Sequence, residues 1–275
     1  MHHKLQMSVC LTIVLLVVCG QLVAEESSRT TSIPHHLLLD DQANNSKVIT
    51  LDERGLHLNY PKQRQQVNSK LWPWRAIGQV NVAASHYCSG VLIAKDKVLT
   101  VAHCLWDAYN KDWYGPSEIH FVAAYARGDY LAYSRIESFQ AAGKFNEKGE
   151  IDLDSVHTDW AILHLRQDIG LEVGFLDLSR EHTVTAGDVI SLAGYRRDRP
   201  EVLTAQLNCK LLAWNKDGSA FDHSCEIIQG DSGGPILRRR NGEWQVLGIQ
   251  SLEAKTEARR WGVAVASRAV KSASR

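Results

Sequence analysis

The chain has 275 residues, 44% of them hydrophobic, and its 31 basic and 31 acidic residues give a formal net charge of zero. This hydrophobic content is enough for one large core or two smaller ones, so most of the chain is expected to fold. A balanced charge offers no general attraction for nucleic acid or for an anionic membrane, and we expect neither as a partner.

Residues 1–24 have the pattern of a secretory signal peptide. Lys4 precedes the apolar run of residues 10–18, and the small residue Ala24 stands just before two glutamates. This order of a charged, an apolar and a small segment predicts export, to the extracellular space or the periplasm. An uncleaved membrane anchor and a lipoprotein attached through Cys19 remain alternatives, although the apolar run is short for a membrane span.

Residues 25–47 are polar, rich in Ser, Thr and Asn, and show no sustained periodicity. Such a composition is typical of a pro-segment or flexible leader. We therefore assign the folded domain to residues 48–275.

Removal of the signal peptide would take away Cys10 and Cys19. The cysteines that remain are Cys88, Cys104, Cys209 and Cys225. An even number of cysteines in an exported chain predicts two disulfides. No CxxC pair occurs, and neighbouring side chains such as His103 and Cys104 point apart in a strand, so a zinc site is a poor alternative and no metal is expected.

From residue 74 onward, short apolar stretches alternate with turn residues. Examples are residues 76–82, 89–94, 98–102, 118–125, 160–165 and 188–195. Alternating or wholly apolar runs of this length that contain β-branched residues predict strands. The chain is therefore expected to be rich in β-structure.

Asn241-Gly242 lies between two such runs, residues 235–240 and 243–249, and predicts a β-hairpin. Helical patterning is limited to a turn after His103 and a short C-terminal segment from Ala266. These patterns predict an all-β protein of two barrels or sandwiches.

The stretch GDSGGP at residues 230–235 raises the question of a nucleophilic serine. A serine hydroxyl needs a base within hydrogen-bonding reach and a third group that orients the base. The stretch also fits the GxSxG elbow of α/β-hydrolases, but in that fold the histidine follows the serine, whereas the last histidine here is His223. An esterase of that fold is thereby excluded, and no subtilisin-like motif is found, which leaves the order His, Asp, Ser.

Two residues upstream can complete this order. His103 ends the apolar stretch LTVAH, and Asp159 precedes the apolar stretch WAIL. Taken singly, a histidine at a strand end is more often structural, and an aspartate before a strand is usually a turn former. It is their combination with Ser232, in this order, that indicates a catalytic site.

Together these blocks resemble the chymotrypsin-like (trypsin-fold) serine endopeptidases of peptidase family S1, which combine TAAHC, DIAL and GDSGGP in the same order. The resemblance covers about residues 70–268. It implies an all-β fold of two antiparallel Greek-key β-barrels with the active site in the cleft between them, the first at about residues 70–165 and the second at about 175–268.

The resemblance also implies the role of each residue. Ser232 would be the nucleophile, His103 the general base and then acid, and Asp159 the residue that orients the histidine. The backbone N–H groups of Gly230 and Ser232 would form the oxyanion hole. We expect a monomer that needs no cofactor and acts on protein or peptide substrates.

Disulfide pairing follows from the same resemblance. Cys88 and Cys104 would brace the histidine loop, as the corresponding family pair does. Cys209 would then pair with Cys225, which departs from the common animal pattern.

The strand Gly248–Ser251 looks like the family's strand along the first substrate pocket. In that position Ser251 would hydrogen-bond Asp159, and Gln250, Ser251 and Glu253 would contact the substrate.

The stretch WPWRAIGQV at residues 72–80, together with HSCEIIQGDSGGP at residues 223–235, resembles the bacterial V8-like, glutamyl-endopeptidase-related branch more than the digestive enzymes. An activation site of the form R-[IV]-[IV]-G-G is absent from the sequence. In the family, the residue at Asp231 is often paired with a newly freed amino terminus, because a buried charge needs a partner. The polar leader at residues 25–47 motivates the hypothesis of a zymogen that is cut after Lys47 or near Lys62.

Substrate preference is predicted from the residues around the pocket. Gln250 and Ile227 stand where glutamate-accepting relatives carry a histidine and a small hydroxyl residue, which argues against a glutamyl preference. Glu226 lies six residues before Ser232, where trypsins carry their acid, and would favour Arg or Lys at the cleaved position through a charge-assisted hydrogen bond. A one-residue shift in this loop would move Glu226 out of the pocket.

The non-enzymatic alternative is a secreted binding protein that retains the fold but is catalytically latent. Its usual signature is a replaced member of the triad. His103, Asp159 and Ser232 are all present.

Overall fold

The computed structural model describes residues 64–179 and 184–273. The predicted signal peptide (1–24), the predicted leader (25–47) and the candidate cleavage positions at Lys47 and Lys62 lie outside the described residues. None of the helices in the described part of the chain has the length and apolar character needed to cross a lipid bilayer.

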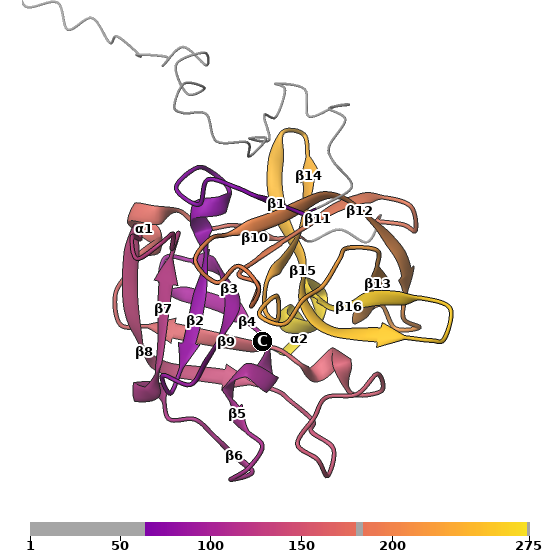
Figure 1. The fold of residues 1–275 in the computed structure, drawn as a ribbon, viewed down its shortest axis with the longest axis horizontal. Coiled ribbons are helices and arrows are strands. Elements are labelled where there is room, and N and C mark those ends of the chain that lie inside the picture. The colour runs from indigo at the N-terminus through magenta and orange to yellow at the C-terminus, as the bar shows by residue number, and fades with distance from the viewer. Residues whose placement is uncertain (1–63, 180–183, 274–275) are drawn as a thin grey trace, which may run out of the picture. The chain divides into compact units, whose positions relative to one another are not determined.

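The first half of the described chain forms a closed antiparallel barrel, drawn in indigo to rose in Figure 1. Its strands, in their order around the barrel, are β2 (Ile77–Val82), β3 (His86–Ala94), β4 (Lys97–Thr100), β9 (Ala161–Leu165), β8 (Ala132–Ala141) and β7 (Ile119–Ala123). The barrel closes where β7 pairs with β2.

The second half forms another antiparallel barrel, drawn in orange to yellow beside the first. Its strands, in order, are β12 (Thr204–Trp214), β11 (Val189–Gly194), β14 (Pro235–Arg240), β15 (Glu243–Lys255), β16 (Arg260–Ala266) and β13 (Ala220–His223). Pairing of β13 with β12 closes it. The predicted all-β fold of two barrels is confirmed.

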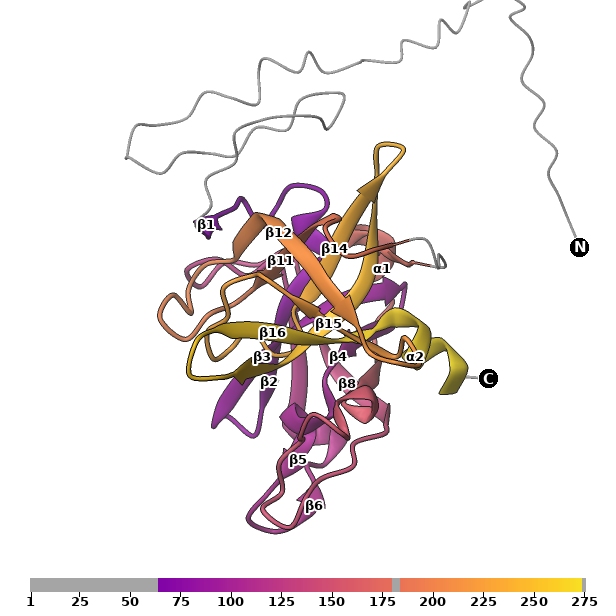
Figure 2. The same ribbon diagram turned by 90° about the vertical axis from the view of Figure 1, so that its right-hand side faces the viewer.

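Short elements complete the fold. The two-residue strands are β1 (Gln65–Gln66), β5 (Trp106–Asp107), β6 (Asp112–Trp113) and β10 (Asp177–Leu178). The 3-10 helices are η2 (Trp74–Ala76), η3 (Ala102–Leu105), η4 (Pro116–Glu118) and η5 (Val156–Thr158), and the α-helices are α1 (Gly170–Val173) and α2 (Ser267–Ala273). The β5–β6 hairpin projects from the end of the molecule opposite the β14–β15 turn (Figure 2).

Each of the apolar stretches named from the sequence contains a strand or part of one, because its side chains fill a barrel interior. Ile77, Leu92 and Leu163 are fully buried in the first barrel, and Leu192 is fully buried in the second. The hairpin predicted at Asn241-Gly242 joins β14 to β15, and both of its residues have positive φ angles, 49° and 87°. Positive φ at both central residues is the requirement that Asn-Gly turns satisfy most readily.

Each barrel contains one disulfide. Cys88 in β3 is bonded to Cys104 in η3, and Cys209 in β12 is bonded to Cys225 just after β13. The sequence separation is 16 residues in both cases. These are the pairs that the family resemblance implied.

Because the two disulfides close loops of equal length, the chain-entropy model predicts equal contributions to stability. Replacing either pair by alanines should lower the free energy of unfolding by about 3 kcal/mol. Urea unfolding of Cys88→Ala/Cys104→Ala beside Cys209→Ala/Cys225→Ala measures both. A several-fold difference between the two losses would contradict loop closure as the dominant contribution.

Candidate active site between the barrels

His103 and Asp159 come together at the edge of the first barrel. His103 lies in η3, directly after the end of β4, and Asp159 lies between η5 and β9. The distance between His103 Nδ1 and Asp159 Oδ2 is 2.8 Å, and the backbone N–H of His103 donates to Asp159 Oδ1 at 2.9 Å. Two contacts to one carboxylate determine both the position and the orientation of the imidazole.

The Asp159 carboxylate is fully buried, and a second donor reaches it from the other barrel. Ser251 in β15 donates through its Oγ to Asp159 Oδ2 at 2.5 Å. Burial by itself would raise the pKa of Asp159, but the charge of His103 and the hydrogen bonds from His103 and Ser251 outweigh it and hold that pKa below its ordinary value. The carboxylate therefore stays ionised beside His103.

His103 is the exposed member of this pair, with 30% of its side chain accessible. Burial lowers its pKa, but the negative charge and hydrogen bond of Asp159 raise it further, so the net shift is above the ordinary value of 6.5. Since Asp159 occupies Nδ1, Nε2 is the nitrogen left to exchange a proton.

Ser232 lies on the loop between β13 and β14, residues 224–234, which we call the serine loop. Ser89 holds this loop against the first barrel. The backbone N–H of Ser89 donates to the Ser232 carbonyl at 2.8 Å, and Ser89 Oγ donates to the Gly230 carbonyl at 2.8 Å. Ser89 follows Cys88, whose disulfide partner Cys104 follows His103. A covalent and hydrogen-bonded path of a few residues thus connects the histidine to the serine loop.

The glycines on this loop permit its close packing. Gly230 and Gly233 have φ angles of 98° and 78°, a region that favours glycine. A Cβ at Gly233 would lie 2.1 Å from the Ser89 carbonyl oxygen, so any side chain there would push the two barrels apart.

Two backbone donors of the loop remain free. Within the part of the chain that the structure describes, the N–H groups of Gly230 and Ser232 have no protein acceptor, whereas Asp231 and Gly233 donate to Ile228 and Gln250. Ser232 is half-buried, and unpaired N–H groups close to its hydroxyl can stabilise a negatively charged oxygen of a substrate.

The described residues show no hydrogen bond between the His103 imidazole and the Ser232 hydroxyl. Contacts between such groups are commonly long in ligand-free sites and shorten when substrate is bound. The described contacts link the segments that carry the two residues through Cys104, Cys88 and Ser89.

The strand next to Ser232 presents an open edge. β14 pairs with β15 only up to Ile249, and among the described strands the stretch from Ser251 to Lys255 pairs with β16 alone. An unpaired strand edge is a template on which an extended peptide can form main-chain hydrogen bonds.

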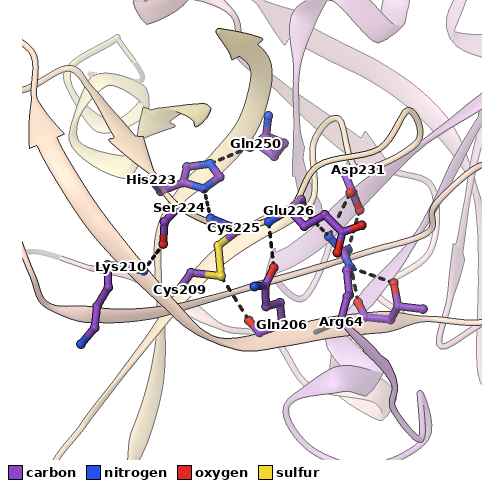
Figure 3. Close-up of a disulfide and its surroundings, with 11 residues drawn as sticks. Arg64, Gln206, Cys209, Lys210, His223, Ser224, Cys225, Glu226, Asp231 and Gln250 are labelled. Atoms are coloured by element: carbon purple, nitrogen blue, oxygen red, sulfur yellow. Dashed lines mark hydrogen bonds and ion pairs between the residues drawn. A yellow bond between two sulfur atoms is a disulfide. The ribbon is translucent and has the colours of Figure 1, made fainter. Parts of the chain in front are cut away.

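Gln250, predicted to contact the substrate, is instead fully buried. Its Oε1 lies 2.7 Å from His223 Nε2 (Figure 3). Its Nε2 donates to the Leu252 carbonyl at 2.9 Å. The backbone N–H of Cys225 donates to His223 Nδ1, so the neutral ring has its proton on Nε2. The side chain of Gln250 is therefore engaged inside the barrel, and its contacts do not support the predicted contact with substrate.

The two predicted pocket acids are paired with arginines. Glu226 lies 3.4 Å from Arg196 and is 51% exposed, and Glu253 lies 3.5 Å from Arg260 at 32% exposure. Glu226 also lines a cavity that Arg64 and Arg196 share. A carboxylate facing two guanidinium groups is poorly placed to receive another cation, so the contacts of Glu226 do not support its predicted role.

Asp231 has a partner that the sequence analysis missed. Its two carboxylate oxygens accept hydrogen bonds from Arg64 Nη1 and Nη2 at 2.9 and 2.5 Å (Figure 3). In the described structure this side chain, and not a freed amino terminus, is the cation beside Asp231. Burial raises the pKa of Asp231, and the Arg64 charge opposes that rise.

Three side chains in this region, Arg64 among them, were not predicted from the sequence. Arg64 stands in a polar stretch with no motif, Ser89 was recorded only as part of a strand, and His223 served only to judge chain order. Their contacts span 27 to 167 residues of sequence, so only the three-dimensional arrangement reveals them.

One group of possible metal ligands occurs among the described residues, formed by Cys88, His103 and Cys104. The disulfide occupies both sulfur atoms, so no thiolate is available there. This group therefore does not fit a metal ion.

The chain is similar to known proteins in both sequence and structure. The family model described as Trypsin matches residues 62–273. A glutamyl endopeptidase of Bacillus licheniformis is 21% identical over 189 residues, which are 69% of this chain and 57% of that protein. The chain thus spans just over half the length of this curated relative.

A solved structure of Glu endopeptidase in complex with MPD is also similar. The TM-score is 0.62 at 18% sequence identity, and the alignment covers 78% of this chain and 97% of the other. At this identity the likeness supports the two-barrel fold.

The buried His223 provides a test of the packing beside the serine loop. Burial lowers its pKa from 6.5 to about 4, although the hydrogen bond with Gln250 acts in the opposite direction. Between pH 6.5 and 4 the unfolded chain binds a proton at this residue that the folded chain excludes, so its contribution to stability is complete above pH 6.5 and is lost as the pH falls to 4.

We therefore expect the stability advantage of the wild type over His223→Gln to shrink by roughly 3 kcal/mol as the pH falls through this range. Urea unfolding of both proteins at several pH values measures the difference. A difference that does not change with pH would mean that His223 is solvated or already charged in the folded state.

Proposed function

Because the chain belongs to the trypsin family, we propose that it is a secreted serine endopeptidase that hydrolyses peptide bonds through an acyl-enzyme intermediate. The observation that carries this proposal is the contact of a fully buried Asp159 with His103 Nδ1, next to a loop that presents Ser232. Its two disulfides are in keeping with an exported protein.

In the proposed reaction, Ser232 Oγ attacks the carbonyl carbon of the peptide bond while His103 Nε2 takes the hydroxyl proton. The carbonyl oxygen becomes negatively charged and accepts hydrogen bonds from the N–H groups of Gly230 and Ser232. His103 then gives its proton to the leaving amine, which leaves Ser232 acylated. A water molecule, deprotonated by His103, releases the acid product and restores the serine.

Asp159 supports both half-reactions without exchanging a proton itself. Its hydrogen bond keeps the proton of neutral His103 on Nδ1, so that Nε2 is free to act as the base. Its negative charge stabilises the imidazolium that forms in the transition state.

The proposed substrate is an extended segment of protein or peptide. The free edge of β15 from Ser251 onward would form main-chain hydrogen bonds with it. Such binding holds the peptide carbonyl near Ser232 without requiring one particular side chain.

We do not propose the preference for Arg or Lys at the cleaved position that was expected from Glu226. Arg196 neutralises Glu226, and Arg64 adds a second positive charge beside it. The zymogen hypothesis is motivated by the polar segment at residues 25–47 and stays a prediction; the Arg64–Asp231 pair shows only that Asp231 does not need a freed amino terminus as its cationic partner.

A catalytically latent binding protein is the competing function, and the missing hydrogen bond between His103 and Ser232 is the observation that favours it. A fluorophosphonate distinguishes the two, because it reacts only with an activated serine. The endopeptidase proposal predicts covalent labelling of Ser232 and peptide hydrolysis by the wild type. Neither labelling nor hydrolysis by the folded protein would leave the binding function as the better account.

Replacement of Asp159 tests the mechanism. Asp159→Asn should lower kcat about ten-thousand-fold, the loss known for the corresponding change in this family, and Ser232→Ala should lower it about a million-fold.

The raised pKa of His103 places the acidic limb of the pH profile of kcat/KM above pH 6.5 in the wild type, because the base must be neutral. Loss of the Asp159 charge should move this limb to lower pH, and an unchanged limb would contradict the assignment.

Replacement of Glu226 tests substrate preference. A panel of peptides with Arg, Glu, Phe or Ala before the cleaved bond should show ratios of kcat/KM that Glu226→Gln changes by no more than about fivefold, the effect expected of an exposed ion pair. A selective loss of about a hundredfold on the arginine peptide would instead place Glu226 in the substrate pocket.

A further inference from the structure

The Arg64 guanidinium is the most extensively bonded side chain beside the serine loop. Besides its two bonds to Asp231, it donates to the Glu226 carbonyl from Nη1 at 3.2 Å and to Thr204 Oγ1 from Nε at 2.9 Å. Nη2 also approaches the carbonyl oxygens of Gly194 and Thr204 at 3.5 and 3.3 Å. The planar fork of an arginine satisfies all these acceptors in a way that a lysine cannot.

These acceptors lie partly on the serine loop, which presents the free N–H groups, and partly on neighbouring barrel strands. Glu226 and Asp231 bracket Gly230, and Gly194 and Thr204 belong to the barrel strands β11 and β12. Arg64 therefore ties the loop to the barrel wall at two points. Gly230 lies between these two ties, and Ser232 comes one residue after the second.

Both charges of this pair are removed from water. The side chains of Arg64 and Asp231 are 1% and 0% exposed. Removing one partner of a buried ion pair leaves the other charge uncompensated, which is strongly unfavourable. The folded loop therefore depends on a cation at this position.

The chain around Arg64 is anchored in the same barrel. β1 follows Arg64 directly and pairs with β12, and the N–H of Val67 donates to the Leu203 carbonyl at 3.1 Å. The cation is thus supplied by a residue within the chain that directly precedes a strand of the sheet.

Both oxygens of the Asp231 carboxylate are already engaged. Oδ1 accepts from Arg64, and Oδ2 accepts from Arg64 and from the backbone N–H of Ile228. The methylene of Gly194 packs beside Oδ1, where an added Cβ would lie only 2.8 Å away. An amino terminus could reach Asp231 only by displacing Arg64.

We propose that Arg64 is a positioning residue that holds Asp231, and through it the Gly230 and Ser232 N–H groups, in their active arrangement while the residues upstream of Arg64 are still attached. This inference rests on the proposed endopeptidase function. It implies that cleavage within residues 1–63 is not the event that forms the active site.

The first test replaces the cation in the full chain. Arg64→Met should lower kcat by about a hundredfold or more with little change in KM, because oxyanion stabilisation is lost while the peptide-binding edge is intact. Arg64→Lys should retain more activity than Arg64→Met, because it keeps the charge. Arg199→Met is the matched control, since Arg199 is exposed and lines the same cavity without touching Asp231, and it should stay within about threefold of the wild type.

Near-ultraviolet circular dichroism establishes whether each variant is folded. A folded Arg64→Met with wild-type kcat and wild-type rate of fluorophosphonate labelling would overturn the proposal. An equal fall in kcat in Arg64→Met and Arg199→Met would also overturn it, because the fall would then reflect the charge of the cavity and not the contact with Asp231.

The second test does not depend on the folding of a variant. Wild-type chain that retains residues 25–63, verified by mass spectrometry before and after reaction, should label with fluorophosphonate at the same rate as chain trimmed within this segment. Labelling that begins only after trimming would overturn the role of Arg64 and leave the endopeptidase function standing. Failure of both forms to label would refute the proposed function itself, and this inference with it.

Discussion

The candidate site depends on two carboxylates that are kept out of water, one in each barrel. An ionised carboxylate is stable in such a place only if it is paired and hydrogen-bonded. Asp159 is paired with His103 and Asp231 with Arg64. The first pair orients the proposed base, and the second holds the loop that presents the proposed nucleophile.

The same requirement explains how two separate barrels present one site. Ser251 of the second barrel completes the hydrogen bonds of Asp159, and Ser89 of the first barrel holds the carbonyls on either side of Asp231. Each barrel thus contributes a donor to the loop or carboxylate of the other. The Cys88–Cys104 disulfide adds a covalent link between the segment that carries Ser89 and the one that carries His103.

The fold was largely predictable because its signals are local. Runs of alternating or wholly apolar residues became strands, and Asn241-Gly242 became the predicted turn. The predicted bond between Ser251 and Asp159 is present, because the spacing of Ser251 along β15 resembles the family closely enough to set its register.

What the sequence did not reveal are contacts between side chains from distant segments. Gln250 and Glu226 occupy the expected positions along the chain, but His223 and Arg196 engage their polar ends. Arg64 lies 167 residues from Asp231, and no local pattern marks it as the partner of a buried acid. Neither the direction of a side chain nor its partner follows from residue type and spacing alone.

The central claim is that Asp159 holds His103 with its proton on Nδ1 and leaves Nε2 to act as the base. A nitrogen-15 nuclear magnetic resonance titration of the His103 ring in the full chain measures this directly. The account predicts that Nδ1 stays protonated throughout and that Nε2 titrates with a pKa above 6.5. A neutral ring protonated on Nε2, or a pKa below 6.5, would contradict it.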